Sequence, residues 1–165
     1  MEKMKKKLST LVFILLIILM AVNAFSQSMG RTYKTALGVK FYPGAISVKH
    51  FTSNKVALEG LGHFWNYGFR LTGLYEIHGD INDAPGLKWY VGPGAHIGIW
   101  NDHYKDEFDN DDEAYFGIDG VLGLDFKFNK APINMSVDIQ PHFNFGTDGK
   151  TGFDLWGGLA IRYTF

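Results

Sequence analysis

Four polar side chains are of types that could combine into a catalytic group: His96, Asp119, Ser136 and His142. A histidine beside an aspartate supplies two parts of a nucleophilic triad, and Ser136 is the nearest hydroxyl of the right type. Such a group would suit a lipid-modifying membrane enzyme. No strained nucleophile turn accompanies these residues, so we favour a structural role in which the charges pair with one another.

A second candidate is the acidic segment formed by residues 101–113. Clustered carboxylates can hold a hard cation such as calcium, or be bridged by one to an anionic surface. The spacing lacks the glycine and the terminal glutamate of an EF-hand loop. We therefore predict a solvated acidic loop and no metal or other cofactor. The weak metal candidates in it are Asp106, Glu107, Asp109, Asp111, Asp112 and Glu113.

The elements that must position these residues are strands, because polar and apolar residues alternate with a period of two from residue 33 onward. Between the alternating segments lie short runs of Gly, Pro, Asn and Ser, which are turn formers. The predicted strands span residues 33–41, 45–51, 55–65, 68–77, 87–100, 114–127, 133–145 and 153–165. Eight strands predict an all-β, antiparallel, up-and-down barrel.

The apolar parity of these strands has its aromatic residues at the strand ends and its aliphatic residues, such as Leu58, Leu122 and Val137, in the middle. Two aromatic girdles around an aliphatic belt are typical of a barrel wall that faces lipid. The predicted girdle residues are Phe41, Phe64, Phe69, Phe116, Phe143 and Phe153 at one end, and Tyr75, Trp89, Phe126 and Tyr163 at the other.

The opposite parity carries charged residues that alternate with glycines, as a narrow lumen requires. An eight-stranded barrel is too narrow for an aqueous channel, so we predict a lumen plugged by paired charges. The residues assigned to this network are Glu59, His63, Arg70, Glu76, His96, Asp119, Asp125, Asp138 and Arg162.

Hairpin geometry predicts three contacts within the network. A symmetric loop after residue 100 would place His96 opposite Asp119. The tight turn at residues 66–67 would place His63 opposite Arg70, and the last hairpin would place Asp138 diagonal to Arg162.

The N-terminal segment, residues 1–26, has the pattern of a secretory signal peptide, with four lysines, an apolar run and small residues at the end. Cleavage is predicted after Ala24 or Ser26, which leaves residues 27–165 as a single barrel domain. The apolar run of residues 11–22 would span only about 18 Å as a helix, so a retained anchor is the weaker alternative.

The composition excludes several other classes of protein. The chain of 165 residues has no cysteine, which excludes a disulfide scaffold and a lipid-modified N-terminal cysteine. The processed chain would be net negative, so nucleic acid is not an expected partner. A closed barrel has no free sheet edge to force association, and we predict a monomer.

The whole region from residue 33 to the end resembles the small eight-stranded outer-membrane barrels of the OmpX and OmpA-barrel type. The alternating C-terminal residues Leu159, Ile161, Tyr163 and Phe165 resemble the signal by which the outer-membrane barrel assembly machinery recognises its clients. The resemblance implies membership of the outer membrane protein β-barrel domain family. It also implies the outer membrane of a Gram-negative bacterium as the location, and outer-membrane lipid and the assembly machinery as partners.

Three functions follow as hypotheses. The leading one is a non-enzymatic barrel that serves envelope structure or surface contact through its third and fourth outer loops. The first two outer connections are tight turns, whereas members of the family that the chain resembles usually bind partners through longer loops. The alternatives are a lipid-modifying outer-membrane enzyme and a soluble lipocalin-like binder, in which the aromatic parity would line a ligand cavity.

Overall fold

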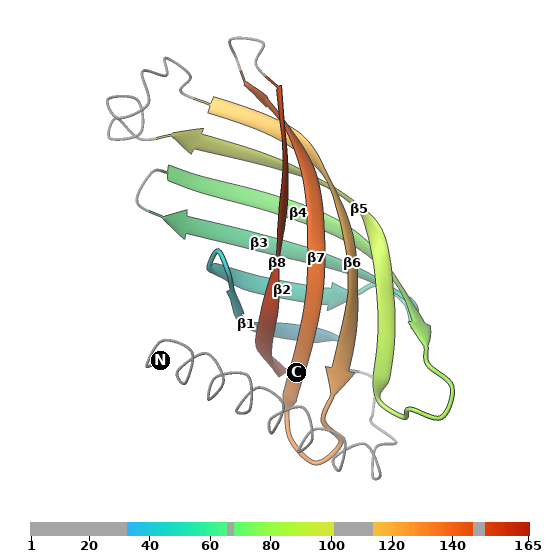
Figure 1. Cartoon of the computed structure of the whole chain (residues 1–165). Helices are drawn as coiled ribbons and strands as arrows, with labels where there is room; N and C mark the ends of the chain where they lie inside the picture. The colour runs from blue at the N-terminus through green and yellow to red at the C-terminus, as the bar shows by residue number, and fades with distance from the viewer. Residues whose placement is uncertain (1–32, 66–67, 101–113, 147–150) are drawn as a thin grey trace, which may run out of the picture.

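A computed structural model describes residues 33–65, 68–100, 114–146 and 151–165. They form eight antiparallel strands, in which each strand pairs with the next and β8 pairs with β1, so the sheet closes into a barrel (Figure 1). No helix in these ranges is long and apolar enough to cross a membrane. The strands are β1 (Thr35–Phe41), β2 (Ala45–Phe51), β3 (Val56–Trp65), β4 (Gly68–Asp80), β5 (Leu87–Trp100), β6 (Ala114–Lys127), β7 (Ile133–Gly146) and β8 (Thr151–Thr164).

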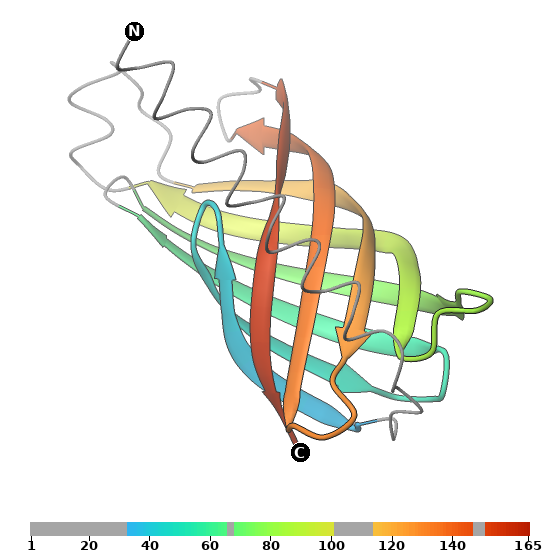
Figure 2. The same ribbon diagram turned by 60° about the horizontal axis from the view of Figure 1, so that its bottom comes forward.

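The two ends of the barrel differ. The end that holds the start of β1 and the C-terminus, called here the terminal end, also carries the connections 52–55, 81–86 and 128–132 (Figure 2). The backbone nitrogen of Phe165 donates to the Thr35 carbonyl at 2.8 Å, which fastens the end of the chain to its first strand. The opposite end, called the loop end, carries the tight turn after β1.

The predicted all-β, eight-stranded up-and-down barrel is confirmed, and β2, β5 and β6 have the predicted bounds. The largest difference is at β4, which was predicted to end at residue 77. Gly79 instead pairs with Trp89, and Asp80 pairs with Lys88, so the ladder continues past the glycine that was assigned to the turn. The remaining strand ends differ by one or two residues.

The predicted register is correct where the turn is tight. His63 pairs with Arg70 across β3 and β4, as the turn at residues 66–67 requires. Across β5 and β6 the prediction was wrong: His96 pairs with Gly117, and Asp119 pairs with Gly94. The ladder begins with Ile99 opposite Ala114 and is therefore shifted by two residues from a loop that was assumed to be symmetric.

The predicted diagonal contact of Asp138 with Arg162 was also wrong. Asp138 pairs with Gly158, whereas Arg162 pairs with Asn134, four residues away along β7. The ladder continues up to Phe145, so the hairpin is again shifted by two residues. A shift of two keeps every side chain on its predicted face, because the side-chain period of a strand is two.

Glycines on the inner wall make room for large inward side chains. A Cβ at Gly98 would lie 2.2 Å from the ring of Tyr115, and a Cβ at Gly117 would lie 2.3 Å from the ring of His96. Both distances are far below van der Waals contact. The ring of His96 therefore occupies the space that the side chain of its cross-strand partner would otherwise fill.

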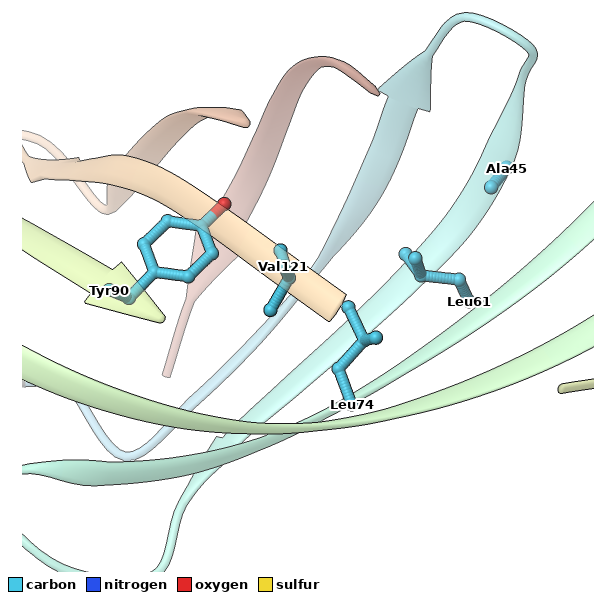
Figure 3. Close-up of a cluster of buried hydrophobic side chains, with 5 residues drawn as sticks. All are labelled: Ala45, Leu61, Leu74, Tyr90 and Val121. Atoms are coloured by element: carbon cyan, nitrogen blue, oxygen red, sulfur yellow. The ribbon is translucent and has the colours of Figure 1, made fainter. Parts of the chain in front are cut away.

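The interior is layered along the barrel axis. The inner face of β3 carries His63, Leu61 and Glu59 in that order toward the terminal end, and β4 and β6 likewise place Leu74 and Val121 between charged residues. Figure 3 shows the apolar cluster of the lumen, with side chains from β2 to β6: Ala45, Leu61, Leu74, Tyr90 and Val121. A thin apolar layer thus separates two polar ones.

Two prolines interrupt the hydrogen-bond ladders of the wall at outward positions. The β4–β5 ladder pairs Leu74 with Gly94 and resumes only at Ile77 with Val91, which skips Pro93. The β6–β7 ladder skips Pro141 in the same way, between residues 119 and 122 of β6. Proline has no N–H to donate, so each interruption has a direct chemical cause.

Candidate functional site

The nine residues predicted to form the lumen network are all buried, with exposed fractions of 6% or less. Eight of them fall into two groups on either side of the apolar layer, and the ninth, His63, packs against Trp156 toward the loop end. The terminal-side cluster consists of Ser47, Lys49, Glu59, Glu76, Asp125, Asn134, Ser136 and Arg162. The loop-side cluster consists of Lys40, Arg70, His96, Asp119, Asp138 and Gln140, together with the hydroxyl of Tyr90, whose ring belongs to the apolar layer.

Arg162 on β8 is the centre of the terminal-side cluster. Its Nη2 forms an ion pair with Glu59 Oε1 on β3, and its Nε donates to Ser47 Oγ at 2.6 Å. Its Nη1 donates to Asn134 Oδ1 at 3.1 Å and to Ser136 Oγ at 2.8 Å. One guanidinium on β8 therefore contacts side chains from β2, β3 and β7. It links β8 through the lumen to β2 and β3, strands with which β8 forms no ladder.

Lys49 on β2 completes the cluster. Its Nζ lies 2.9 Å from Glu76 Oε2, 3.3 Å from Asp125 Oδ1 and 3.8 Å from Glu59 Oε2. The ammonium also lies 4.3 Å above the centre of the Tyr90 ring, a cation–π distance. Two buried cations thus face three buried carboxylates, and the cluster holds one carboxylate more than it can neutralise.

Glu76 is the surplus carboxylate, because its ion pairs are with Lys49, which it shares with two other carboxylates, and with His78, whose Nε2 lies 3.5 Å away, while its remaining neighbour, Glu59, is itself acidic. We expect Glu76→Gln to change the free energy of unfolding by less than about 1 kcal/mol, or to raise it, since the amide keeps an oxygen for Lys49 and removes an uncompensated charge. Urea unfolding of the refolded barrel measures this difference.

The matched control for that prediction is Glu59→Gln, the same change in the same cluster. Glu59 neutralises Arg162 and accepts from Ser47 Oγ at 2.6 Å. Its loss is expected to lower the free energy of unfolding clearly more than the loss of Glu76. Equal effects of the two variants would contradict the assignment of the surplus charge.

Asp119 on β6 is the centre of the loop-side cluster. Its Oδ1 accepts from Arg70 Nη2 at 2.5 Å and from Gln140 Nε2 at 3.0 Å. Its Oδ2 lies 2.7 Å from His96 Nδ1. The predicted contact of His96 with Asp119 is therefore present in spite of the shifted register, because the ring reaches across two positions of the ladder.

Lys40 connects this cluster across the lumen. Its Nζ forms an ion pair with Asp138 Oδ1 at 2.6 Å and donates to Gln140 Oε1 at 3.4 Å. The other carboxylate oxygen of Asp138 accepts from the Tyr90 hydroxyl at 2.6 Å. Since these residues lie on β1, β5 and β7, their side chains cross the interior and fill it.

Aromatic side chains close the lumen toward the loop end. The Arg70 guanidinium lies 4.2 Å from the centre of a Trp156 ring. The rings of His63 and His142 meet the same tryptophan edge-on, at centroid distances of 5.1 and 4.8 Å. The arrangement is a packed cap over Arg70.

The candidate catalytic residues do not come together as a triad. Ser136 belongs to the terminal-side cluster, where it accepts from Arg162, whereas His96 and Asp119 lie beyond the apolar layer. The second histidine, His142, contacts the ring of His96 at 5.5 Å rather than any serine. A nucleophile, a base and an orienting acid in mutual contact, as acyl transfer requires, are therefore not found among these four residues.

Sequence reasoning missed the neutral members of the network, Tyr90, Gln140 and Asn134, and gave no partners to Lys40 and Lys49. All five lie on the inward parity of their strands, and this is the signal that could have found them. Tyr90 and Lys40 contact strands that are not their neighbours, and so does Lys49 through Glu76 and Asp125, so hairpin pairing does not reveal these contacts. The contacts of Gln140 and Asn134 with β6, and the position of Lys49 opposite Glu59, lie between neighbouring strands and were within its reach.

The outer wall is apolar. The aliphatic belt between the rims is exposed, with Leu122 at 52%, Val137 at 51% and Ile97 at 62%. The lipocalin-like alternative requires the aliphatic and aromatic side chains to line an internal cavity. In the structure these side chains face outward, and the charged side chains face inward. The exposed aliphatic residues of this belt include Val39, Leu58, Leu71, Val91, Ile97, Leu122, Val137, Ile139 and Leu159.

The predicted girdle residues all lie on the outer face, with Phe69 and Phe126 half-buried against neighbouring rings. Rings pair across strands at the loop end, where Phe143 meets Phe153 at 5.0 Å, and the C-terminal Tyr163 and Phe165 pair at 5.1 Å. The four residues of the predicted assembly signal point outward together: Leu159, Ile161, Tyr163 and Phe165.

Two predictions concern residues outside those that the structure describes. The acidic segment of residues 101–113 is one, and the signal peptide of residues 1–26 is the other. Within the described part of the chain, no group of three or more His, Cys, Asp or Glu side chains is arranged to hold a metal ion.

Comparison of the chain with known protein families, with curated proteins and with solved structures finds no match in any of the three. A closed eight-stranded barrel does not by itself identify one family. The likeness of the C-terminal residues to an outer-membrane assembly signal therefore stays a prediction.

Proposed function

We propose that this protein is a non-enzymatic integral barrel of the outer membrane of a Gram-negative bacterium, with a plugged polar lumen. Its role would be envelope structure or surface contact through the third and fourth outer loops, residues 101–113 and 147–150. The observation that carries this proposal is the inverted polarity of the barrel: charged side chains fill the inside and aliphatic side chains cover the outside.

The apolar outer wall of the barrel favours lipid over water as its surroundings. Soluble proteins rarely expose contiguous apolar surface beyond a few hundred Å², whereas here outward aliphatic residues occur on all eight strands. In lipid the same surface costs nothing to expose, and a closed ladder leaves few backbone groups without a partner. The aromatic residues at both rims suit the two interfaces of a bilayer.

The two ends of the barrel support an orientation. Membrane barrels of this type have short periplasmic turns and longer outer loops. The terminal end carries connections of at most six residues, while the segment after β5 has thirteen, so we place the terminal end in the periplasm. Outer-membrane lipid and the barrel assembly machinery would be the partners, and the protein would act as a monomer.

Electrophoresis with and without boiling tests the architecture in its proposed membrane. We expect the unboiled protein to stay folded in dodecyl sulfate and to change mobility on heating, because each strand is hydrogen-bonded to two neighbours. Separation of inner and outer membranes is expected to place this heat-modifiable form in the outer membrane. Processed protein recovered from the soluble periplasm without detergent would contradict the proposal.

A further inference from the structure

The terminal end of the barrel holds a cavity of about 270 Å³ that the proposed function does not use. It lies at the mouth of the lumen, between the end of β2, the start of β5 and the end of β6. Its lining comes from these strands and from the connections at the terminal end, and it includes none of the aliphatic residues of the outer belt. The lining residues used below are Tyr33, Lys34, Phe51, Lys88, Asp125 and Lys127.

The charge of the lining is positive. Three lysines, Lys34, Lys88 and Lys127, face a single carboxylate, that of Asp125. This carboxylate is also engaged from the lumen side, where Lys49 lies 3.3 Å from Oδ1 and the Asn134 amide donates to Oδ2 at 2.8 Å. The three lysine charges at the mouth therefore exceed the single surplus carboxylate of the terminal-side cluster beneath them.

The three ammonium groups differ in how many of their protons are engaged. Lys127 donates to the carbonyls of Phe128 and Ala131 at 2.6 and 2.7 Å, which leaves one proton. Lys88 pairs at 2.8 Å with Asp80, a carboxylate that is 74% exposed, and such a pair is weak. The Lys34 ammonium has no partner among the described residues.

One wall of the cavity is aromatic. The rings of Tyr33 and Phe51 meet edge to face, with centroids 5.1 Å apart. Burial and the neighbouring Asp125 raise the pKa of the Tyr33 phenol, so this wall stays uncharged at neutral pH. The cavity thus combines a neutral ring surface with cations that have protons to donate.

We propose that this cavity binds a small organic oxyanion, a carboxylate or a phosphate monoester carried on a compact apolar body. The oxyanion would accept from Lys34 and Lys88, with Lys127 contributing its remaining proton, and the apolar body would lie against Phe51. A volume just below the usual range for drug-sized ligands restricts the body to about the size of one ring. A lining without residues of the aliphatic belt favours a ligand from the aqueous phase over a lipid headgroup.

Titration of the detergent-solubilised barrel with benzoate and phenyl phosphate tests this site, and the test does not depend on the membrane location. We expect saturable shifts of the backbone amide resonances of Lys34 and Gly86, with no saturable shift from benzyl alcohol or benzylammonium. Inorganic phosphate is expected to bind more weakly than phenyl phosphate, because it lacks the apolar body. Equal binding of benzyl alcohol and benzoate would overturn the role of charge.

The variant carrying Lys34→Gln and Lys88→Gln is expected to weaken benzoate binding about tenfold. Lys55→Gln is the matched control, since it removes the same charge at the same end from a residue that does not line the cavity, and its effect is expected to stay below about twofold. Equal loss from Lys55→Gln, or no loss in the double variant, would overturn the proposal.

A last titration distinguishes the source of the oxyanion. Phosphatidylglycerol added to the detergent is expected to leave the affinity for benzoate unchanged. Displacement of benzoate by this lipid would overturn the assignment to an aqueous ligand. Because the heat-modifiability experiment reports only on the barrel, a failure of either proposal is recognised separately.

Discussion

Replacement of Arg162 by methionine is expected to lower the free energy of unfolding by about 3–5 kcal/mol. The guanidinium is 1% exposed and is bonded to Glu59, Ser47, Asn134 and Ser136. Methionine fills much of the volume but leaves the buried Glu59 carboxylate without its main counter-charge. Urea unfolding of the refolded barrel, followed by tryptophan fluorescence, measures the loss.

Two further variants distinguish the lost charge pair from lost packing. Arg162→Lys keeps the charge but cannot satisfy all four partners, so an intermediate loss is expected. The double variant Arg162→Met with Glu59→Gln removes both charges and is expected to recover part of the stability of the single methionine variant. A loss below about 1 kcal/mol for Arg162→Met would show that the terminal-side cluster does not hold the barrel together.

Introduction of arginine at Leu122, in the middle of the outer belt, is expected to cost about 2–4 kcal/mol in phospholipid vesicles. The side chain points away from the barrel and is already 52% exposed, so neither the lumen nor the ladder is disturbed. The cost would come from the hydrocarbon around the wall. Unfolding by urea in vesicles, compared with the unchanged protein, gives the value.

Phe153→Arg is the matched control for depth, because Phe153 is 61% exposed but lies at the loop-end rim. The same arginine there is expected to cost less than about 1 kcal/mol, since it reaches the interface. In water, both surface changes would stay within about 0.5 kcal/mol. Equal small effects at the two positions would therefore contradict the membrane proposal.

Strand number and the inner and outer faces could be predicted from the sequence because they depend on a local property. Alternation with a period of two assigns each side chain to a face, whatever the strand pairs with. Glu59 and Arg162 are inside and Leu122 is outside for this reason. The turn residues between the alternating segments then determined the number of strands.

Register and partners across the lumen could not be predicted because they depend on geometry beyond one hairpin. The tight turn at residues 66–67 left one possible pairing of His63 with Arg70. Longer loops allow shifts of two residues that keep every face unchanged, and the predicted pairing of His96 failed by such a shift. The ion pair of Lys40 with Asp138 joins β1 to β7 across the lumen and has no local signature.

The prolines of the outer wall bear on how the barrel moves. In an open sheet a proline is harmless on an edge strand, but a closed barrel has no edge, so Pro93 and Pro141 each break a ladder inside the wall. Fewer cross-strand bonds make local opening cheaper. The ladders on both sides of the β5–β6 pair are thus interrupted partway along the strands, and we expect this pair to bend at these two places relative to the rest of the barrel.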